Sequence, residues 1–120
     1  MEATPLERAI IQLNEFAKMV SHYETIPWTE LHLRFAILTV GLHDEWVETH
    51  DRASIDALQH EVSDRMSRVL DARATYMGEA NVANDALVKA AFRDLVDVDS
   101  IVKKACPVEE ETSAKKPRVE

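Results

Sequence analysis

Hydrophobic residues recur at intervals of three and four along most of the chain, the spacing that places them on one face of an α-helix. Four segments show this pattern, and short polar or proline-containing breaks separate them. The first segment begins with a strong start signal, because Thr4 can cap a helix, Pro5 suits its first position and Glu7 stands where a capping box needs it. The pattern predicts helices at about residues 5–20, 28–50, 53–78 and 82–105.

The composition supports the same fold class. The 120 residues include only two glycines and four prolines, and residues that favour helices are plentiful. Four amphipathic helices joined by short links are typical of a bundle with antiparallel neighbours. We therefore predict an all-α, four-helix bundle-like domain over residues 1–105. After Cys106 and Pro107 the segment is charged, has few apolar anchors and is predicted to be a disordered tail over residues 106–120.

The charge and the apolar runs limit the possible partners. A net charge of -8 leaves no continuous basic face, so binding to nucleic acid is not expected. The stretch LHLRFAILTVGL is too short and too polar to cross a bilayer, and no secretory signal is visible at the start. A single cysteine cannot form an internal disulfide. We expect a soluble, cytoplasmic protein with no membrane contact.

The apolar stripe of the second helix ends in a carboxylate. Leu31, Phe35, Leu38 and Leu42 follow one another at helical spacing, and the next position is Glu45. A buried carboxylate has to be neutralised, hydrogen-bonded or bound to a metal ion, because an isolated buried charge is too costly. Glu45 therefore indicates either a polar partner in the core or a metal site.

Glu45 belongs to the first of two acidic pairs, Glu45 with Glu48 and Glu61 with Asp64. Residues three apart on a helix lie on nearly the same side, so each pair offers oxygen ligands in one direction. If the second and third helices pack antiparallel, the two pairs can face each other and hold Mg²⁺, which prefers oxygen ligands. The alternative is a solvated acidic surface, since 22 of the 120 residues are acidic.

The motif Glu-x-x-Glu, twelve residues, then Glu-x-x-Asp resembles the signature of the all-α nucleoside triphosphate pyrophosphohydrolases, the MazG-like family. The segment TIPWTE is similar to the Pro-Trp segment that precedes the first acidic pair in that family. The segment HDRASIDALQHEVSDRMSRVL is similar to its short joint and second acidic pair. The resemblance covers about residues 6–70.

The resemblance implies Mg²⁺-dependent hydrolysis of a nucleoside triphosphate to a monophosphate and pyrophosphate. Glu45, Glu48, Glu61 and Asp64 would bind Mg²⁺, which neutralises the triphosphate and lowers the pKa of a bound water. Glu48 is the candidate for accepting that water's proton. The resemblance also implies a homodimer, and a second copy would help so small a bundle to complete its core.

Nucleotide contacts are less sharply predicted. Trp28, Phe35 or Trp46 could stack on the base, although such aromatic residues are more often core or interface anchors. Lys89 and Arg93 in the last predicted helix are candidate phosphate partners, and a solvated role is the alternative for both.

Two other classes compete with this interpretation. A non-catalytic helical interaction module, including a relative that has lost activity, would pair Glu45 with an arginine such as Arg34 or Arg68. The two His-Asp dipeptides allow an HD phosphohydrolase, but the chain is short for that fold. A di-iron bundle is excluded by spacing, since no histidine follows a glutamate by three residues.

Overall fold

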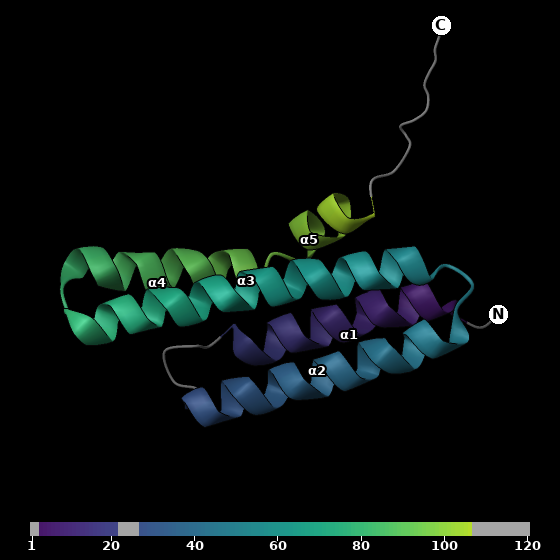
Figure 1. Cartoon of the computed structure of the whole chain (residues 1–120), viewed down its shortest axis with the longest axis horizontal. Coiled ribbons are helices and arrows are strands. Elements are labelled where there is room, and N and C mark those ends of the chain that lie inside the picture. Colours follow the sequence, from purple (N-terminus) through teal and green to yellow (C-terminus); the bar gives the residue numbers. More distant parts are fainter. Residues whose placement is uncertain (1–2, 22–26, 107–120) are drawn as a thin grey trace, which may run out of the picture.

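The computed structural model describes residues 3–21 and 27–106, and these fold entirely into helices and connecting segments. The predicted all-α class is thereby confirmed. The five helices are α1 (Pro5–Val20), α2 (Trp28–Glu48), α3 (Arg52–Gly78), α4 (Val82–Leu95) and α5 (Val98–Ala105) (Figure 1). Residues 107–120 of the predicted tail (106–120) and part of the break before α2 lie outside the described residues, whereas Cys106 is described and packs against the core.

Side-chain caps define where most of these helices begin. The Thr4 hydroxyl accepts a hydrogen bond from the Glu7 amide at 3.1 Å, and the Glu7 carboxylate accepts one from the Thr4 amide at 2.8 Å, which is the predicted capping box. Asp51 caps α3 and Asn81 caps α4 by accepting a hydrogen bond from the amides of Ser54 and Asn84, without the reciprocal bond of a capping box. The caps satisfy amides that have no partner inside the helix.

The predicted fourth helix is wrong in one respect, because it is divided. The chain leaves the helical path after Leu95, and Asp97 starts α5 by accepting a hydrogen bond from the Ser100 amide at 3.2 Å. An aspartate that bonds a nearby amide offers the backbone an alternative to continuing the helix. Within α4, Val88 is buried and the neighbouring Leu87 is 52% exposed.

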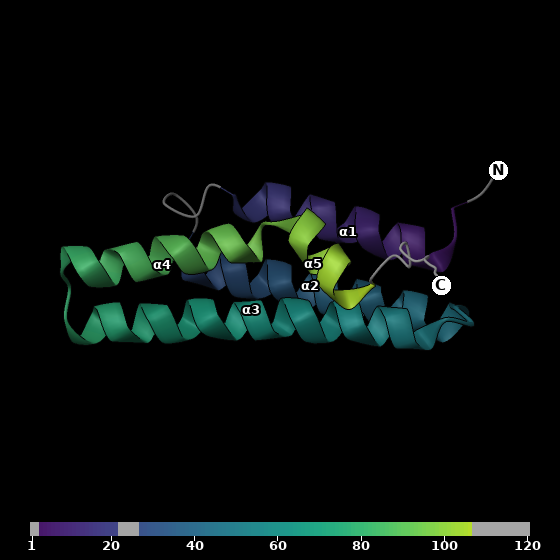
Figure 2. The same cartoon turned by 90° about the horizontal axis from the view of Figure 1, so that it is seen from above.

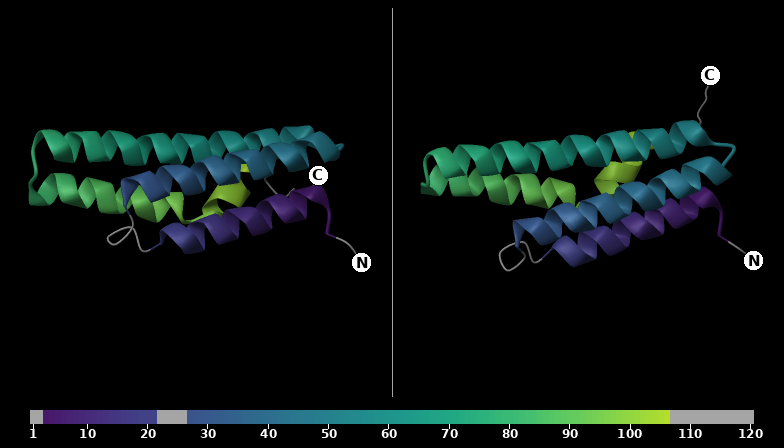
Figure 3. Two further views of the ribbon diagram at one scale, coloured as in Figure 1. Left: turned by 90° about the horizontal axis from the view of Figure 1, so that it is seen from below. Right: turned by 60° about the horizontal axis from the view of Figure 1, so that its bottom comes forward.

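The helices form two antiparallel hairpins that lie side by side. α1 packs mainly on α2, and α4 packs mainly on α3 (Figure 1). The break after Leu95 frees α5 to turn away from α4, and α5 then lies between α1 and α3 (Figure 2). The view from below shows the hairpins as neighbours with α5 bridging them (Figure 3). The arrangement is therefore a pair of hairpins with a bridging helix.

One apolar core runs through both hairpins. It contains fully buried side chains from α1, α2, α3, α4 and α5, among them Leu13, Leu42, Leu58, Leu95 and Ile101. Ile101 is the one buried residue of α5, so this short helix is held mainly by its inner side. Among the described helices, none is both long and apolar enough to span a bilayer.

Cys106 fastens the end of α5 to the start of α3. Its thiol donates a hydrogen bond to the Ser54 carbonyl oxygen, with 3.9 Å between sulfur and oxygen. Burial raises the pKa of the Cys106 thiol, and the charge of Asp51 acts in the same direction. The group therefore stays protonated at neutral pH and is poorly suited to act as a nucleophile.

Replacing the α5 cap tests the division of the fourth helix. Asp97→Ala removes the side chain that accepts from Ser100 and should lower the free energy of unfolding by about 1 kcal/mol. Urea denaturation followed by circular dichroism measures the change. Asp99→Ala, in the first turn of the same helix, is the matched control and should have less than half that effect. Equal effects would contradict the capping role of Asp97.

Candidate functional site

Glu45 is buried, as its place in the apolar stripe of α2 predicts, and polar groups from α1 bond its carboxylate. It is 8% exposed. The Arg8 Nε donates to Glu45 Oε1 at 2.9 Å, and a second Arg8 nitrogen lies 2.9 Å from the same oxygen. The Gln12 amide donates to Glu45 Oε2 at 3.2 Å. Both carboxylate oxygens therefore have partners within the chain.

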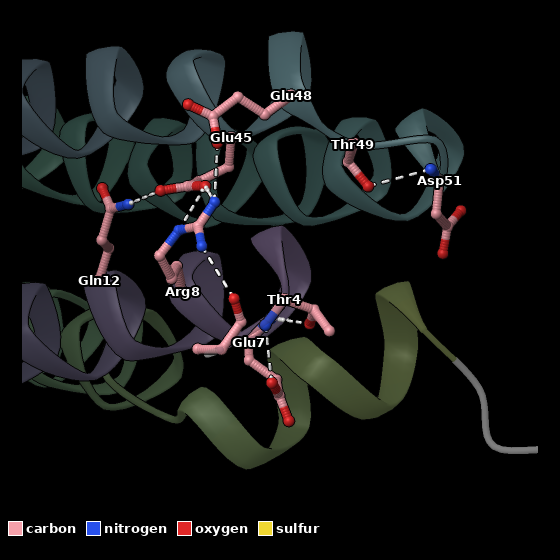
Figure 4. A network of polar contacts seen from close by, with 9 residues as sticks. Thr4, Glu7, Arg8, Gln12, Glu45, Glu48, Thr49 and Asp51 are labelled. Carbon is pink, nitrogen blue, oxygen red and sulfur yellow. Dashed lines mark hydrogen bonds and ion pairs between the residues drawn. The ribbon is translucent and has the colours of Figure 1, made fainter. Parts of the chain in front are cut away.

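Arg8 also forms hydrogen bonds with two groups other than Glu45. One terminal nitrogen donates to Glu48 Oε1 at 2.8 Å, and the other donates to the Ala3 carbonyl at 2.8 Å (Figure 4). The guanidinium thus joins the first turn of α1 to the last turn of α2. Glu48 is largely exposed, so its share of the interaction is screened by water and contributes little. Of the two carboxylates that Arg8 bonds, the buried Glu45 is the one whose charge depends on Arg8 for stabilisation.

Gly41 allows the Gln12 side chain to reach Glu45. A Cβ atom at position 41 would lie 1.7 Å from the Gln12 side-chain oxygen, so any larger residue would displace that amide. The glycine is therefore explained by the close approach of α1 to α2 at this point. It forms part of the same network as Arg8, Gln12 and Glu45.

Glu61, the first acid of the second pair, is also buried and also paired with an arginine. The Arg65 Nε donates to Glu61 Oε2 at 2.8 Å, and both side chains are less than 10% exposed. The terminal nitrogens of Arg65 donate to the Asp94 carbonyl at 2.7 Å and the Ser100 hydroxyl at 3.0 Å. Arg65 therefore connects α3 with the end of α4 and the first turn of α5.

Asp64, the second acid of that pair, lies in a different setting. Its carboxylate accepts a hydrogen bond from Arg68 at 2.9 Å, one turn further along α3, and both side chains are about half exposed. Such a pair between neighbouring turns of an exposed helix face contributes only a few tenths of a kcal/mol, on the order of 0.3–0.5. Asp64 is a surface residue of α3.

The two acidic pairs do not converge in this arrangement. Glu45 and Glu48 lie on the side of α2 that faces α1, whereas Glu61 lies on the side of α3 that faces α4 and α5. The two acidic pairs also lie at different levels along the axes of α2 and α3. Glu45 lies three residues before the end of α2, whereas Glu61 lies nine residues after the start of α3, so the two differ in level by about six residues, or roughly 9 Å.

This separation bears directly on the expected Mg²⁺ site. Within residues 3–21 and 27–106, no group of three or more histidine, cysteine, aspartate or glutamate side chains is placed to hold a metal ion. The carboxylates that would serve as ligands are held by Arg8, Arg65 and Arg68 instead. As they stand, the four acids do not fit one metal ion, and Mg²⁺ binding would require the partly exposed Arg8 and the buried Arg65 to withdraw.

The residues expected to contact a nucleotide lie apart from the acids. Trp28 is the first residue of α2, about 25 Å along that helix from Glu45. Its ring packs against Phe92, with ring centroids 5.8 Å apart, and the Arg73 guanidinium lies 4.4 Å from its centroid. Trp28 thus anchors one hairpin against the other. This agrees with the alternative interpretation of the aromatic residues as core or interface anchors.

Lys89 and Arg93 both lie on α4. Lys89 forms an ion pair with Asp85 at 3.1 Å, one turn earlier on the same helix. Arg93 is exposed in the last turn of α4, where a positive charge complements the helix dipole. The structure places neither beside Glu45 or Glu48, so these residues and Trp28 do not form one site with the first acidic pair.

Sequence reasoning missed the partners of the buried acids. Arg8 and Arg65 were not singled out, and Arg34 and Arg68, the expected candidates, pair with Glu30 and Asp64. A signal for Arg65 was present, because it follows Glu61 by four residues on the same helix. No local signal identifies Arg8, whose contact spans 37 positions of the chain.

Comparison with known proteins gives no further assignment: no family model, curated protein or solved structure matches the chain.

A double-mutant cycle measures the interaction between Arg8 and Glu45. Arg8→Met keeps most of the side-chain length but leaves a buried carboxylate with Gln12 alone, so the free energy of unfolding should fall by about 1–3 kcal/mol. Adding Glu45→Gln removes the charge, and the double variant should lose at least about 1 kcal/mol less than the sum of the single variants. Urea denaturation gives all three values.

The exposed pair on α3 supplies the control for this cycle. Arg68→Met breaks the contact with Asp64 and should cost under about 0.5 kcal/mol, because water replaces the lost interaction. Strictly additive effects of Arg8→Met and Glu45→Gln would show that the two side chains are not energetically coupled.

Proposed function

We propose that the chain is a non-catalytic helical interaction module, which associates with a second copy of itself through the outward side of α2. The observation that carries the proposal is that α2 is apolar on two opposite sides. Leu31, Leu38 and Leu42 are buried in the core. On the other side, four large apolar residues are 53–62% exposed: Leu33, Ile37, Val40 and Val47. We call these four residues the outer stripe.

The outer stripe has the form of a contact surface. Its members are four, three and seven residues apart, so they lie in one line along the helix. Single exposed apolar residues are ordinary in proteins, but an apolar line on a helix that already buries its other side indicates a partner, and here only Asp44 stands between Val40 and Val47 in that line. The exposed Ile11 and Met19 of α1 add to the apolar surface of the α1–α2 hairpin.

The charges beside the outer stripe favour a second copy as the partner. Arg34, which pairs with Glu30 on its own helix, lies near the beginning of α2, and Asp44 lies near its end. If two α2 helices pack antiparallel about a point near Thr39, Arg34 of each copy lies opposite Asp44 of the other. The contact is then the same on both copies, and such a two-fold interface closes without leaving a free apolar edge. The pairing also fixes the register of the stripe.

The polar network supports the non-catalytic part of the proposal. All four acids of the two pairs are already bonded to an arginine of the same chain. The buried members join helices, α1 to α2 through Glu45 and α3 to the joint of α4 and α5 through the pair of Glu61 and Arg65. In this function the carboxylates stabilise the fold and do not bind a ligand.

A second candidate function is Mg²⁺-dependent hydrolysis of a nucleoside triphosphate to a monophosphate and pyrophosphate. One observation favours it: Glu45 and Glu61, the first acid of each pair in the motif, are the buried acids among the described residues. The enzyme would require Arg8 and Arg65 to release them and α2 and α3 to bring the pairs together. Glu48 and Asp64 would complete the ligand set, with Glu48 as the base.

Mutations of the outer stripe test self-association. Wild-type protein should run as a dimer in size-exclusion chromatography with light scattering, and Ile37→Glu or Val40→Glu should weaken the dimer at least about tenfold by placing charge in the contact. Ser67→Glu, on an exposed face of α3, is the control and should leave the dimer intact. A monomeric wild type at the highest attainable concentration would overturn this part of the proposal.

A metal and substrate assay separates the two candidate functions. Mg²⁺ is titrated by calorimetry into the wild type and into Glu48→Ala/Asp64→Ala, which alters the exposed acids and should spare the core. Released pyrophosphate is then measured over a panel of nucleoside triphosphates. The module should show no Mg²⁺ binding that depends on these acids and no pyrophosphate. Pyrophosphate that the wild type releases and the variant does not would establish the enzyme instead.

A further inference from the structure

The outward side of α4 is apolar although this helix lies at the surface. Between residues 82 and 92, every exposed position carries an apolar side chain: Val82, Ala83, Ala86, Leu87 and Ala90. We call these five residues the α4 face. Its two large members are strongly exposed, Val82 at 87% and Leu87 at 52%. A surface helix ordinarily turns polar residues to water, so this face requires an explanation.

The charged residues of α4 leave its outward side free. Asp85 and Lys89 are half-buried and pair with each other at 3.1 Å. The α4 face therefore runs without a charge over about 12 Å of the helix. α4 lies at the upper edge of the molecule in Figure 1 and α2 at the lower edge, so the α4 face and the outer stripe belong to different hairpins.

The charges at the two ends of the α4 face fit a second copy of the chain. Arg93 lies in the last turn of α4 and Glu79 lies just before the helix, and within the described part of the chain neither side chain forms an ion pair. If two α4 helices pack antiparallel about Ala86, Arg93 of each copy comes to the level of Glu79 of the other. The same register sets the large Val82 against the small Ala90. Facing alanines at the centre let the two helices approach closely.

We propose that the α4 face is a second self-association surface, through which dimers formed by α2 join into larger assemblies. The α4 contact itself needs only two copies of α4, whereas growth beyond the dimer rests on the proposed function of the outer stripe. A chain with two different two-fold surfaces does not stop at the dimer, because each contact leaves the other surface free.

The size of the α4 face sets the strength of this contact. Three of its five residues are alanines, so two copies bury less than the roughly 1,200 Å² of a stable interface and belong to the class of weak contacts. The α4 contact should therefore form at higher protein concentration than the α2 contact. Dimers should dominate in dilute solution, and larger assemblies should appear only on concentration.

Sedimentation of four proteins from about 10 to about 500 µM tests the proposal. They are the wild type, Leu87→Glu, Ile37→Glu and the double variant, and both substitutions place a helix-favouring residue at an exposed position. The wild type should exceed the mass of a dimer at the highest concentration, and Leu87→Glu should stop at the dimer. Ile37→Glu should form a dimer only at high concentration, and the double variant should stay monomeric.

The same measurement separates failure of the α4 contact from failure of the outer stripe. A Leu87→Glu variant that assembles like the wild type, or an Ile37→Glu variant that is monomeric at about 500 µM, would overturn the α4 contact. If Leu87→Glu is monomeric while Ile37→Glu and the wild type dimerise alike, the α4 contact stands and the outer stripe is refuted.

A charge exchange tests the antiparallel register. Arg93→Glu should weaken assembly beyond the dimer at least about threefold, since each contact contains two such pairs, and Arg93→Glu/Glu79→Arg should restore it. Lys103→Glu, on the exposed side of α5, changes the net charge equally and should have no effect. A double variant that assembles no better than Arg93→Glu would overturn the two-fold pairing of α4.

Discussion

A carboxylate in an apolar core has to be neutralised where it lies, and this chain meets that requirement twice with an arginine. Arg8 reaches Glu45 from another helix, and Arg65 reaches Glu61 from the next turn of the same helix. Removing one member would leave a buried charge, which is far more damaging than losing an apolar contact. The positions of α1 and α5 therefore depend on these two pairs in addition to the hydrophobic core.

The sequence predicted the parts of the fold that depend on local signals. The capping box at Thr4 and the approximate bounds of α1, α2 and α3 follow directly from local patterns in the sequence. The burial of Glu45 agrees with its place in the apolar stripe of α2 and decides against a solvated surface, which was the alternative for that residue. The division at Asp97 was missed because a capping aspartate within an otherwise regular apolar pattern gives only a weak signal.

The candidate site was harder to predict because it depends on which flank of each helix a residue occupies. Residues three apart share a side, but that rule does not tell which neighbouring helix the side will face. Glu45 and Glu48 turned toward α1, and Glu61 turned toward the joint of α4 and α5. The hypothesis of facing pairs required a common level on α2 and α3, and the register of the helices sets the two levels apart. The fold class was thus predictable, and the pairing of charges was not.

The bridging position of α5 has a consequence for synthesis of the chain. Helices α1 to α4 leave the ribosome before α5. The hydrogen bonds of Arg65 are complete only when Ser100 has been synthesised, and Ile101 then closes the core between α1 and α3. Until then, Arg65 of the nascent chain lacks one of its hydrogen bonds, and the apolar side chains between α1 and α3 are exposed to water. The two hairpins can form as they emerge, but the contacts that join α1 to α3 through α5 form only once α5 has emerged. A chain that ends before residue 98 would thus be a natural substrate for cellular quality control.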